Sequence, residues 1–108
     1  MTTVTITKEH NSIVSVECSG HTGYGCEGED IVCAALSSIV QTALLGLLHN
    51  VRGVQYRRDD ESGYLAIDLP RDMTESERHD ADVITGTMLL GISDLHEGFS
   101  DFIELEVK

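Results

Sequence analysis

One segment of this chain carries no charged side chain, from Ile31 to Leu48. Its two serines, one glutamine and one threonine fall within one arc of a helix, and apolar residues fill most of the remaining surface. The segment reaches the lower limit for a membrane span. Its polar side chains lie near the centre, however, so we expect no membrane partner. We expect instead a helix from about Asp30 to His49 that is buried on more than one side.

The sequence on either side of this helix predicts a small sheet and a second helix. Alternating apolar and polar residues predict strands at 3–7, 14–19, 51–58, 64–69 and 103–108. The second helix begins after Thr74, which can form a capping box with Glu77, and ends near Glu97, before Gly98. The order β-β-α-β-β-α-β predicts an α+β fold. We expect one domain over residues 1–108, with an antiparallel or mixed sheet and both helices packed on it.

The alternation also predicts which strand residues face the core. In the second strand, Cys18 shares a face with Val14 and Val16. We therefore expect Cys18 to be a small apolar core residue. In the last strand, the residues expected to point inward are Ile103, Leu105 and Val107.

The composition limits the partners and the compartment. Seven basic against nineteen acidic residues give a net charge of −12. This charge disfavours nucleic acid as a partner, because phosphate contacts need basic side chains, and it suits a basic partner. Residues 1–6 have neither a basic start nor an apolar core, so we expect no signal peptide and a cytoplasmic protein. Three cysteines without paired spacing do not indicate a disulfide framework.

The segment before the uncharged helix combines a histidine, a cysteine at its far end and a run of glycines. If Asp30 caps the helix, Cys33 lies in the first turn. Unpaired N–H groups and the helix dipole there favour a thiolate, and the same N–H groups could form an oxyanion hole. With His21 within reach of a loop, Cys33 has the arrangement that nucleophilic catalysis requires. The glycines that allow such a loop are Gly20, Gly23, Gly25 and Gly28.

Two polar residues near Cys33 each have two interpretations. Asp30 either caps the helix or orients His21 as the third member of a triad. Ser37 follows Cys33 by about one turn on the same helix face. Its hydroxyl could bond to the sulfur or the substrate, or back to the carbonyl of Cys33. Both residues are supporting candidates.

The string from Gly20 to Ser37, GHxGxxxxGxDxVCAAxS, resembles the signature of the ribosomal-processing cysteine proteases, the Prp family. The resemblance is tight over this string and looser over the whole chain. It implies a cysteine endopeptidase that removes a short N-terminal extension from a large-subunit ribosomal protein. By motif position, Cys33 would be the nucleophile and His21 the general base.

The same resemblance implies several further properties. Gly20 and Gly23 enter the candidate site with the motif, as parts of a mobile loop over it. The substrate would carry apolar aromatic residues before the scissile bond, the enzyme would be a homodimer, and no cofactor or metal would be needed. Cys26 departs from the family pattern, in which a residue without a thiol is expected.

Two alternatives compete with the protease interpretation. Cys18, His21, Cys26 and Cys33 have the spacing C-x2-H-x4-C-x6-C and could bind zinc tetrahedrally. Against this, Cys18 is expected inside a strand and Cys33 inside a helix. The second alternative is a ribosome-associated binding module without activity. The presence of both His21 and Cys33 argues against it, because a silent relative needs neither.

Overall fold

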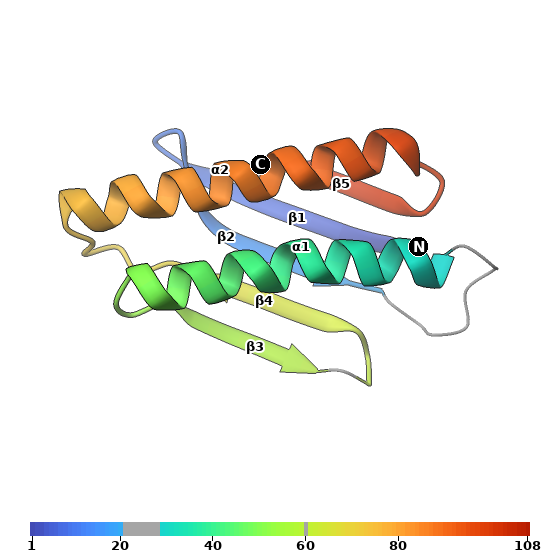
Figure 1. The fold of residues 1–108 in the computed structure, drawn as a ribbon, viewed down its shortest axis with the longest axis horizontal. Coiled ribbons are helices and arrows are strands. Elements are labelled where there is room, and N and C mark those ends of the chain that lie inside the picture. The colour runs from blue at the N-terminus through green and yellow to red at the C-terminus, as the bar shows by residue number, and fades with distance from the viewer. Residues whose placement is uncertain (21–28, 60) are drawn as a thin grey trace.

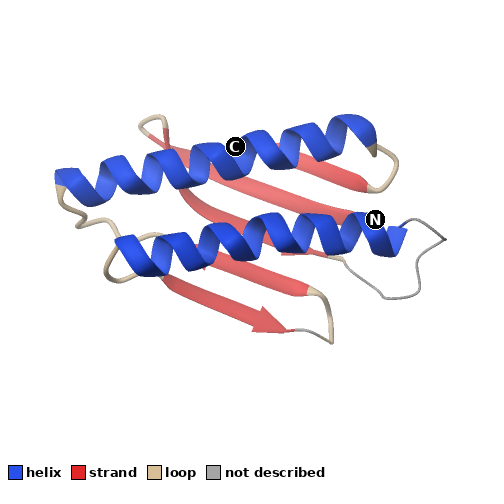
Figure 2. Cartoon of the chain, viewed as in Figure 1, coloured by secondary structure: helices blue, strands red, loops and turns tan. Residues whose placement is uncertain are grey.

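A computed structural model describes residues 1–20, 29–59 and 61–108, with only the backbone at Glu29 and Asp30. The predicted element order β-β-α-β-β-α-β is confirmed (Figures 1 and 2). The elements are β1 (Thr2–Glu9), β2 (Ser12–Ser19), α1 (Glu29–Asn50), β3 (Gln55–Asp59), β4 (Tyr64–Asp68), α2 (Glu75–Gly98) and β5 (Ile103–Val107).

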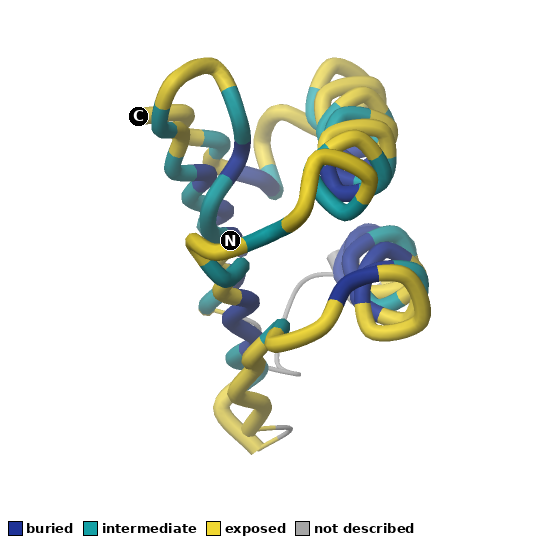
Figure 3. Tube along the Cα trace, turned by 90° about the vertical axis from the view of Figure 1, so that its left-hand side faces the viewer, coloured by how far each residue is buried: buried dark blue, intermediate teal, exposed yellow. Residues whose placement is uncertain are grey.

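The five strands form one mixed sheet in the order β3-β4-β2-β1-β5. Hairpins join β1 to β2 and β3 to β4, so these neighbours are antiparallel, as are β2 and β4. The chain reaches β5 through α2, and β5 pairs parallel to β1. Figure 3 shows both helices side by side on one face of the sheet. The predicted α+β architecture is therefore confirmed, with a mixed sheet.

The first helix starts one residue earlier than predicted. It begins at Glu29, so Asp30 is its second residue and does not cap it. An acidic side chain is favourable in a first turn, which allows the helix to include Glu29. The cap position falls among residues 21–28, outside the described residues. As the fifth helical residue, Cys33 lies just beyond the turn whose N–H groups lack partners.

The apolar residues of α1 divide between the core and the surface. Those that pack into the core are Val32, Leu36, Val40, Ala43, Leu44 and Leu47. Gly46 of α1 and Gly91 of α2 face the other helix, since a Cβ at either would lie in ordinary contact, 3.5 Å, with an isoleucine of that helix. The helix is thus buried against both the sheet and α2, as predicted. Its outer side still exposes Ile31, Leu45 and Leu48.

By length and composition alone, α1 could cross a membrane, with a mean hydropathy of 2.1 over Ile31–Asn50. In the fold, the apolar residues of α1 are explained by the core. The helix contributes many of the core residues that pack against the sheet, and a helix that is buried in this way is apolar on its buried faces.

Three local predictions about the strands were wrong. Val14 is only half-buried, because the pairing shifts between Thr7 and Lys8 and leaves one extra residue on β2. The strand predicted at 51–58 starts only at Gln55, after a turn in which Gly53 has a φ of +85°. Val107 is 48% exposed at the end of an edge strand. The inward position of Cys18 is confirmed.

The second helix begins as predicted. The Thr74 hydroxyl accepts from the Glu77 N–H, and the Glu77 carboxylate accepts from the Thr74 N–H, each at 3.1 Å. Gly98 is the last helical residue and not the first beyond the helix. Its φ is not positive, so a left-handed glycine does not end this helix. The N–H of Phe99 bonds instead to the carbonyls of Leu95 and His96.

Candidate active site

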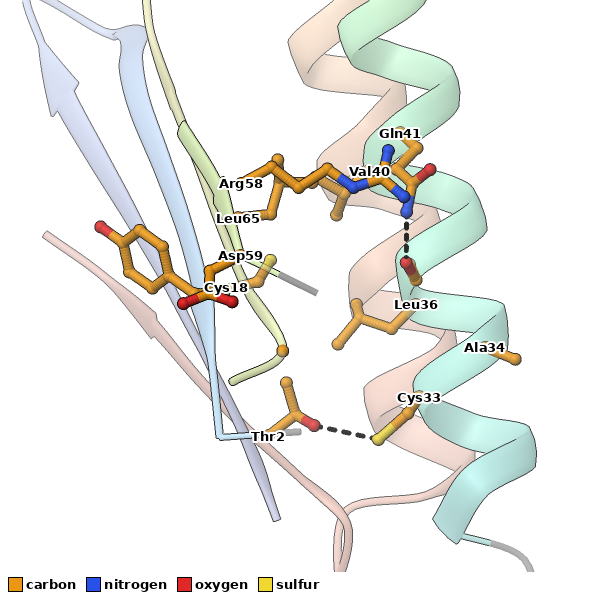
Figure 4. A pocket seen from close by; sticks show the side chains of 13 residues that line it. Thr2, Cys18, Cys33, Ala34, Leu36, Val40, Gln41, Arg58, Asp59 and Leu65 are labelled. Carbon is orange, nitrogen blue, oxygen red and sulfur yellow. Dashed lines mark hydrogen bonds between the residues drawn. The ribbon is translucent and has the colours of Figure 1, made fainter. Parts of the chain in front are cut away.

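The Cys33 thiol points from α1 toward the first residue of β1 (Figure 4). Its side chain is buried, and Sγ lies 3.1 Å from the hydroxyl oxygen of Thr2 (Figure 4). Thr2 is the first residue of β1 and is only 4% exposed. Val4 and Ile6 follow it on the same strand face and are fully buried. The start of β1 therefore lies beneath the first turns of α1, and the two residues meet there.

The backbone around Thr2 is fixed on both sides. Its N–H donates to the carbonyl of Phe102 at 3.0 Å, and Thr2 pairs with Ile103 of β5. On the other side lies Gly20, with a φ of +98°. A Cβ at Gly20 would lie 2.7 Å from the Met1 carbonyl oxygen, which is too close. Gly20 therefore lies against the start of β1, next to Thr2, where only glycine fits.

A cavity of about 520 Å³ opens beside Cys33, between α1 and the β3–β4 hairpin (Figure 4). Its volume falls in the range of ligand pockets. The floor is largely apolar, and polar side chains stand around the rim. The residues that line it are Thr2, Cys18, Cys33, Ala34, Leu36, Ser37, Val40, Gln41, Arg58, Asp59, Gly63, Tyr64 and Leu65.

Two features of the rim involve Ser37 and Arg58. The Ser37 hydroxyl accepts a hydrogen bond from Gln41 Nε2 at 2.7 Å. Within the described part of the chain, it forms neither of the predicted bonds, to the sulfur or to the carbonyl of Cys33. Ser37 lines the cavity and is exposed, so a role toward substrate remains open to it. Arg58 extends from β3 toward Gln41, across the cavity (Figure 4).

Tyr64 of β4 contacts side chains of the neighbouring strands β2 and β3. Its hydroxyl donates to the Glu17 carboxylate at 3.0 Å, and this bond raises the pKa of Tyr64. The Arg57 guanidinium lies 5.9 Å from the centre of the Tyr64 ring. These contacts connect β2, β3 and β4 on the sheet face that points away from α1, because Tyr64 and Glu17 alternate with the buried Leu65 and Cys18.

Cys18 is the second buried thiol of the cavity wall. Burial, and secondarily the negative charge of Glu17, raises the pKa of Cys18 to about 12. This burial disfavours the thiolate form of Cys18, which is the form that attacks carbonyls and binds metals. Cys33, which belongs to the motif from Gly20 to Ser37, remains the candidate nucleophile.

The remaining predicted site residues are described incompletely or not at all. His21, Gly23 and Cys26 lie outside the described residues, so the predicted pairing of His21 with Cys33 stays a prediction. Asp30 is described only in its backbone. Thr2 was missed by the sequence analysis, although the alternation that turns Val4 and Ile6 inward also turns Thr2 inward.

The zinc alternative can be examined only in part. Among the described side chains, those of residues 1–20, 31–59 and 61–108, no three of histidine, cysteine, aspartate or glutamate gather as metal ligands would. Two of the four proposed ligands, His21 and Cys26, fall outside these ranges. The structure thus supplies Cys18 and Cys33 as two buried thiols in the wall of one cavity.

The sequence and the fold of this chain are similar to those of known proteins. A family model described as Cysteine protease Prp matches residues 1–104. The ribosomal processing cysteine protease Prp of Staphylococcus aureus (strain Mu50 / ATCC 700699) is 30% identical over 112 residues, covering 100% of both chains. A crystal structure of an essential ribosomal processing protease Prp from S. aureus, in complex with a substrate peptide, has a TM-score of 0.86 at 26% identity, with 100% of both chains covered. A second one, with a covalently linked product peptide, has a TM-score of 0.81 at 27% identity and the same coverage.

Proposed function

The chain belongs to the Prp family of cysteine proteases, and from this premise we propose that it removes a short N-terminal extension from a ribosomal protein of the large subunit. The observation that carries this proposal is the buried Cys33 thiol at a cavity large enough for peptide side chains. A similar chain, 27% identical, has been crystallised with a covalently linked product peptide. A covalent link to a peptide requires a nucleophile on the protein, and Cys33 would supply it here.

The proposed reaction uses Cys33 and His21. Cys33 Sγ attacks the carbonyl carbon of the scissile peptide bond, and the resulting tetrahedral intermediate collapses to a thioester as the amine leaves. His21, which has taken the thiol proton, gives it to that amine. A water molecule then hydrolyses the thioester and restores the thiol. The motif from Gly20 to Ser37 supports these roles.

Asp30, Gly23 and Ser37 are proposed as supporting residues. Asp30 and Gly23 take this role from the motif alone, with Asp30 either near the cap of α1 or on His21. Ser37 takes it from its place on the cavity rim. We also propose that the segment from Gly20 to Gly28 opens to admit the peptide and closes over it.

Features of the cavity and of the whole chain support a basic, partly apolar peptide as substrate. Leu36, Val40 and Leu65 make an apolar floor on which aromatic side chains before the scissile bond could pack. The net charge of −12 would attract the lysine and arginine residues of a ribosomal protein. We also propose that the protein is cytoplasmic and forms a homodimer. It would act without a cofactor and without a nucleic-acid partner.

The test is cleavage of a fluorogenic peptide that carries the sequence of such an extension. The unaltered chain should cleave it, whereas Cys33→Ala and His21→Ala should each lose most activity. His79→Ala is the matched control for the histidine variant, since it removes an exposed histidine outside the proposed dyad. Cleavage that survives Cys33→Ala would exclude Cys33 as the nucleophile.

A zinc chelator in the same assay tests the metal alternative. A protease of the proposed kind keeps its activity in the chelator. No cleavage of any peptide, together with stoichiometric zinc whose removal unfolds the chain, would favour the alternative site of Cys18, His21, Cys26 and Cys33.

A further inference from the structure

We propose that Thr2 is a positioning residue for the reaction: its hydroxyl holds the Cys33 sulfur in the direction needed for attack and stabilises the thiolate. The proposal rests on the proposed function, because it presumes that Cys33 is the nucleophile. The observation behind it is the hydrogen bond of 3.1 Å between the Thr2 hydroxyl and Cys33 Sγ, which links residues far apart in the chain.

Burial makes this bond stronger than a surface bond. Thr2 is 4% exposed and Cys33 is 8% exposed, so water does not compete well for either group. A hydrogen bond in such surroundings is electrostatically stronger than in water. A buried polar group without a partner also costs free energy, which keeps the two side chains together.

The Thr2 side chain is itself held rigidly. Its backbone is fixed by the bond to the Phe102 carbonyl and by pairing with Ile103 of β5. Its branched Cβ restricts rotation about χ1, so the hydroxyl has few alternative positions. Gly20 packs against the preceding carbonyl, of Met1, where no larger residue fits. The hydroxyl is thus set on the sheet, while the sulfur is set on α1.

A hydroxyl suits both protonation states of the sulfur. When Cys33 is a thiol, its S–H can donate to the Thr2 oxygen. When Cys33 is a thiolate, the Thr2 O–H can donate to the sulfur, and a bond to the charged form favours that form. The proton can therefore leave Sγ without the sulfur losing its partner. A nucleophile kept in one direction needs less reorganisation before it attacks.

The test compares Thr2→Val with Thr2→Ser. Valine keeps the shape and removes the hydroxyl, whereas serine keeps the hydroxyl. We expect Thr2→Val to lower kcat about tenfold, the size expected for loss of a bond to a charged group, with KM changed by less than about twofold. Thr2→Ser should recover most of the lost kcat. Thr3→Val is the matched control, because Thr3 is the next residue on β1 and points to the opposite sheet face.

A second readout separates positioning from a structural role. The rate of iodoacetamide alkylation at Cys33, followed by peptide mass spectrometry, should reach half its maximum at higher pH in Thr2→Val than in Thr3→Val. Thr2→Ala gives the same comparison if the valine variant does not fold.

The proposal is overturned if Thr2→Val matches Thr3→Val in kcat and in the alkylation profile, or if Thr2→Ser loses as much activity as Thr2→Val. Failure of the proposed function looks different. In that case Cys33→Ala keeps its cleavage activity, whatever the Thr2 variants do.

Discussion

At the scale of single residues, Gly20 links backbone geometry to the site. Its φ of +98° and the 2.7 Å separation between a built Cβ and the Met1 carbonyl oxygen both exclude a side chain. We expect Gly20→Ala to destabilise the fold by about 1–3 kcal/mol. Because the start of β1 must then move, Thr2 should lose its place and kcat should fall. Urea denaturation and peptide cleavage measure the two effects.

Gly86→Ala is the control for this prediction. A Cβ at Gly86, within α2, would meet no atom within 4 Å. Alanine there should stabilise the fold by about 0.5–1 kcal/mol, because it restricts the unfolded chain and favours the helix. Equal stability of the Gly20→Ala and Gly86→Ala variants would contradict the argument for a tight contact at Gly20.

The raised pKa of Cys18 predicts how the free energy of unfolding changes at alkaline pH. Burial raises its pKa from the ordinary 9.0 to about 12, so the folded chain holds this proton at pH values where the unfolded chain has lost it. Its contribution to stability is complete below pH 9.0 and is lost as the pH rises from there toward 12. Between pH 8 and pH 10.5, unfolding of the unaltered chain should become easier by about 1–2 kcal/mol more than that of Cys18→Ala. Identical pH slopes in urea titrations of the two chains would contradict this assignment.

Sequence reasoning reached some residues of the site and missed others for physical reasons. The alternation of β2 correctly predicted that Cys18 is buried, whereas the assignment of Cys33 and Gly20 to the site comes from the motif and stays a prediction. The bond between Thr2 and Cys33 was beyond reach, because it depends on where α1 crosses the first residue of β1. No local pattern in a sequence specifies such a crossing.

At the scale of elements, the capping box of α2 makes a contribution to stability that can be measured directly. Thr74→Ala removes the side-chain acceptor for the Glu77 N–H and should cost about 1 kcal/mol. Ser93→Ala is the control: Ser93 is exposed within α2, away from the cap. That change should be neutral or slightly stabilising. Thermal unfolding followed by circular dichroism would refute the cap if both variants lost equal stability.

Element types and order were predictable from periodicity, whereas their ends and irregularities were not. The box of Thr74 and Glu77 is a local signal, and it placed the start of α2 correctly. The start of α1 was misplaced because Asp30 is acceptable both at a cap and within a first turn. The extra residue at Val14 was missed because Ile13 and Val14 are both apolar, so that the alternation from Val14 to Cys18 looks unbroken. In the structure the buried phase shifts across it, from Ile13 to Val16.

At the scale of the whole molecule, the outer surface of the two helices suggests where a second copy would bind. A groove of about 570 Å³ runs between them, lined by residues such as Ser38, Gly46 and Val83. Large apolar side chains stand exposed on the same two helices, among them Leu45 at 68% and Leu90 at 73%. Exposed apolar surface of this kind is typical of protein interfaces. The proposed homodimer would cover it and leave the cavity beside Cys33, on the sheet side of α1, accessible.

This proposal predicts how the oligomeric state responds to charge. The unaltered chain should sediment as a dimer, and Leu45→Asp and Leu90→Asp should each raise the monomer fraction, because the interface would have to bury an unpaired carboxylate. Tyr56→Asp is the control: Tyr56 is 51% exposed but lies on β3, one of the two edge strands of the sheet. A dimer disrupted only by Tyr56→Asp would move the interface to the sheet edge, and a monomeric unaltered chain would exclude the homodimer. Because each copy carries its own Cys33 and cavity, the monomeric variants should still bind peptide, with any loss of kcat measuring how far the dimer supports the site.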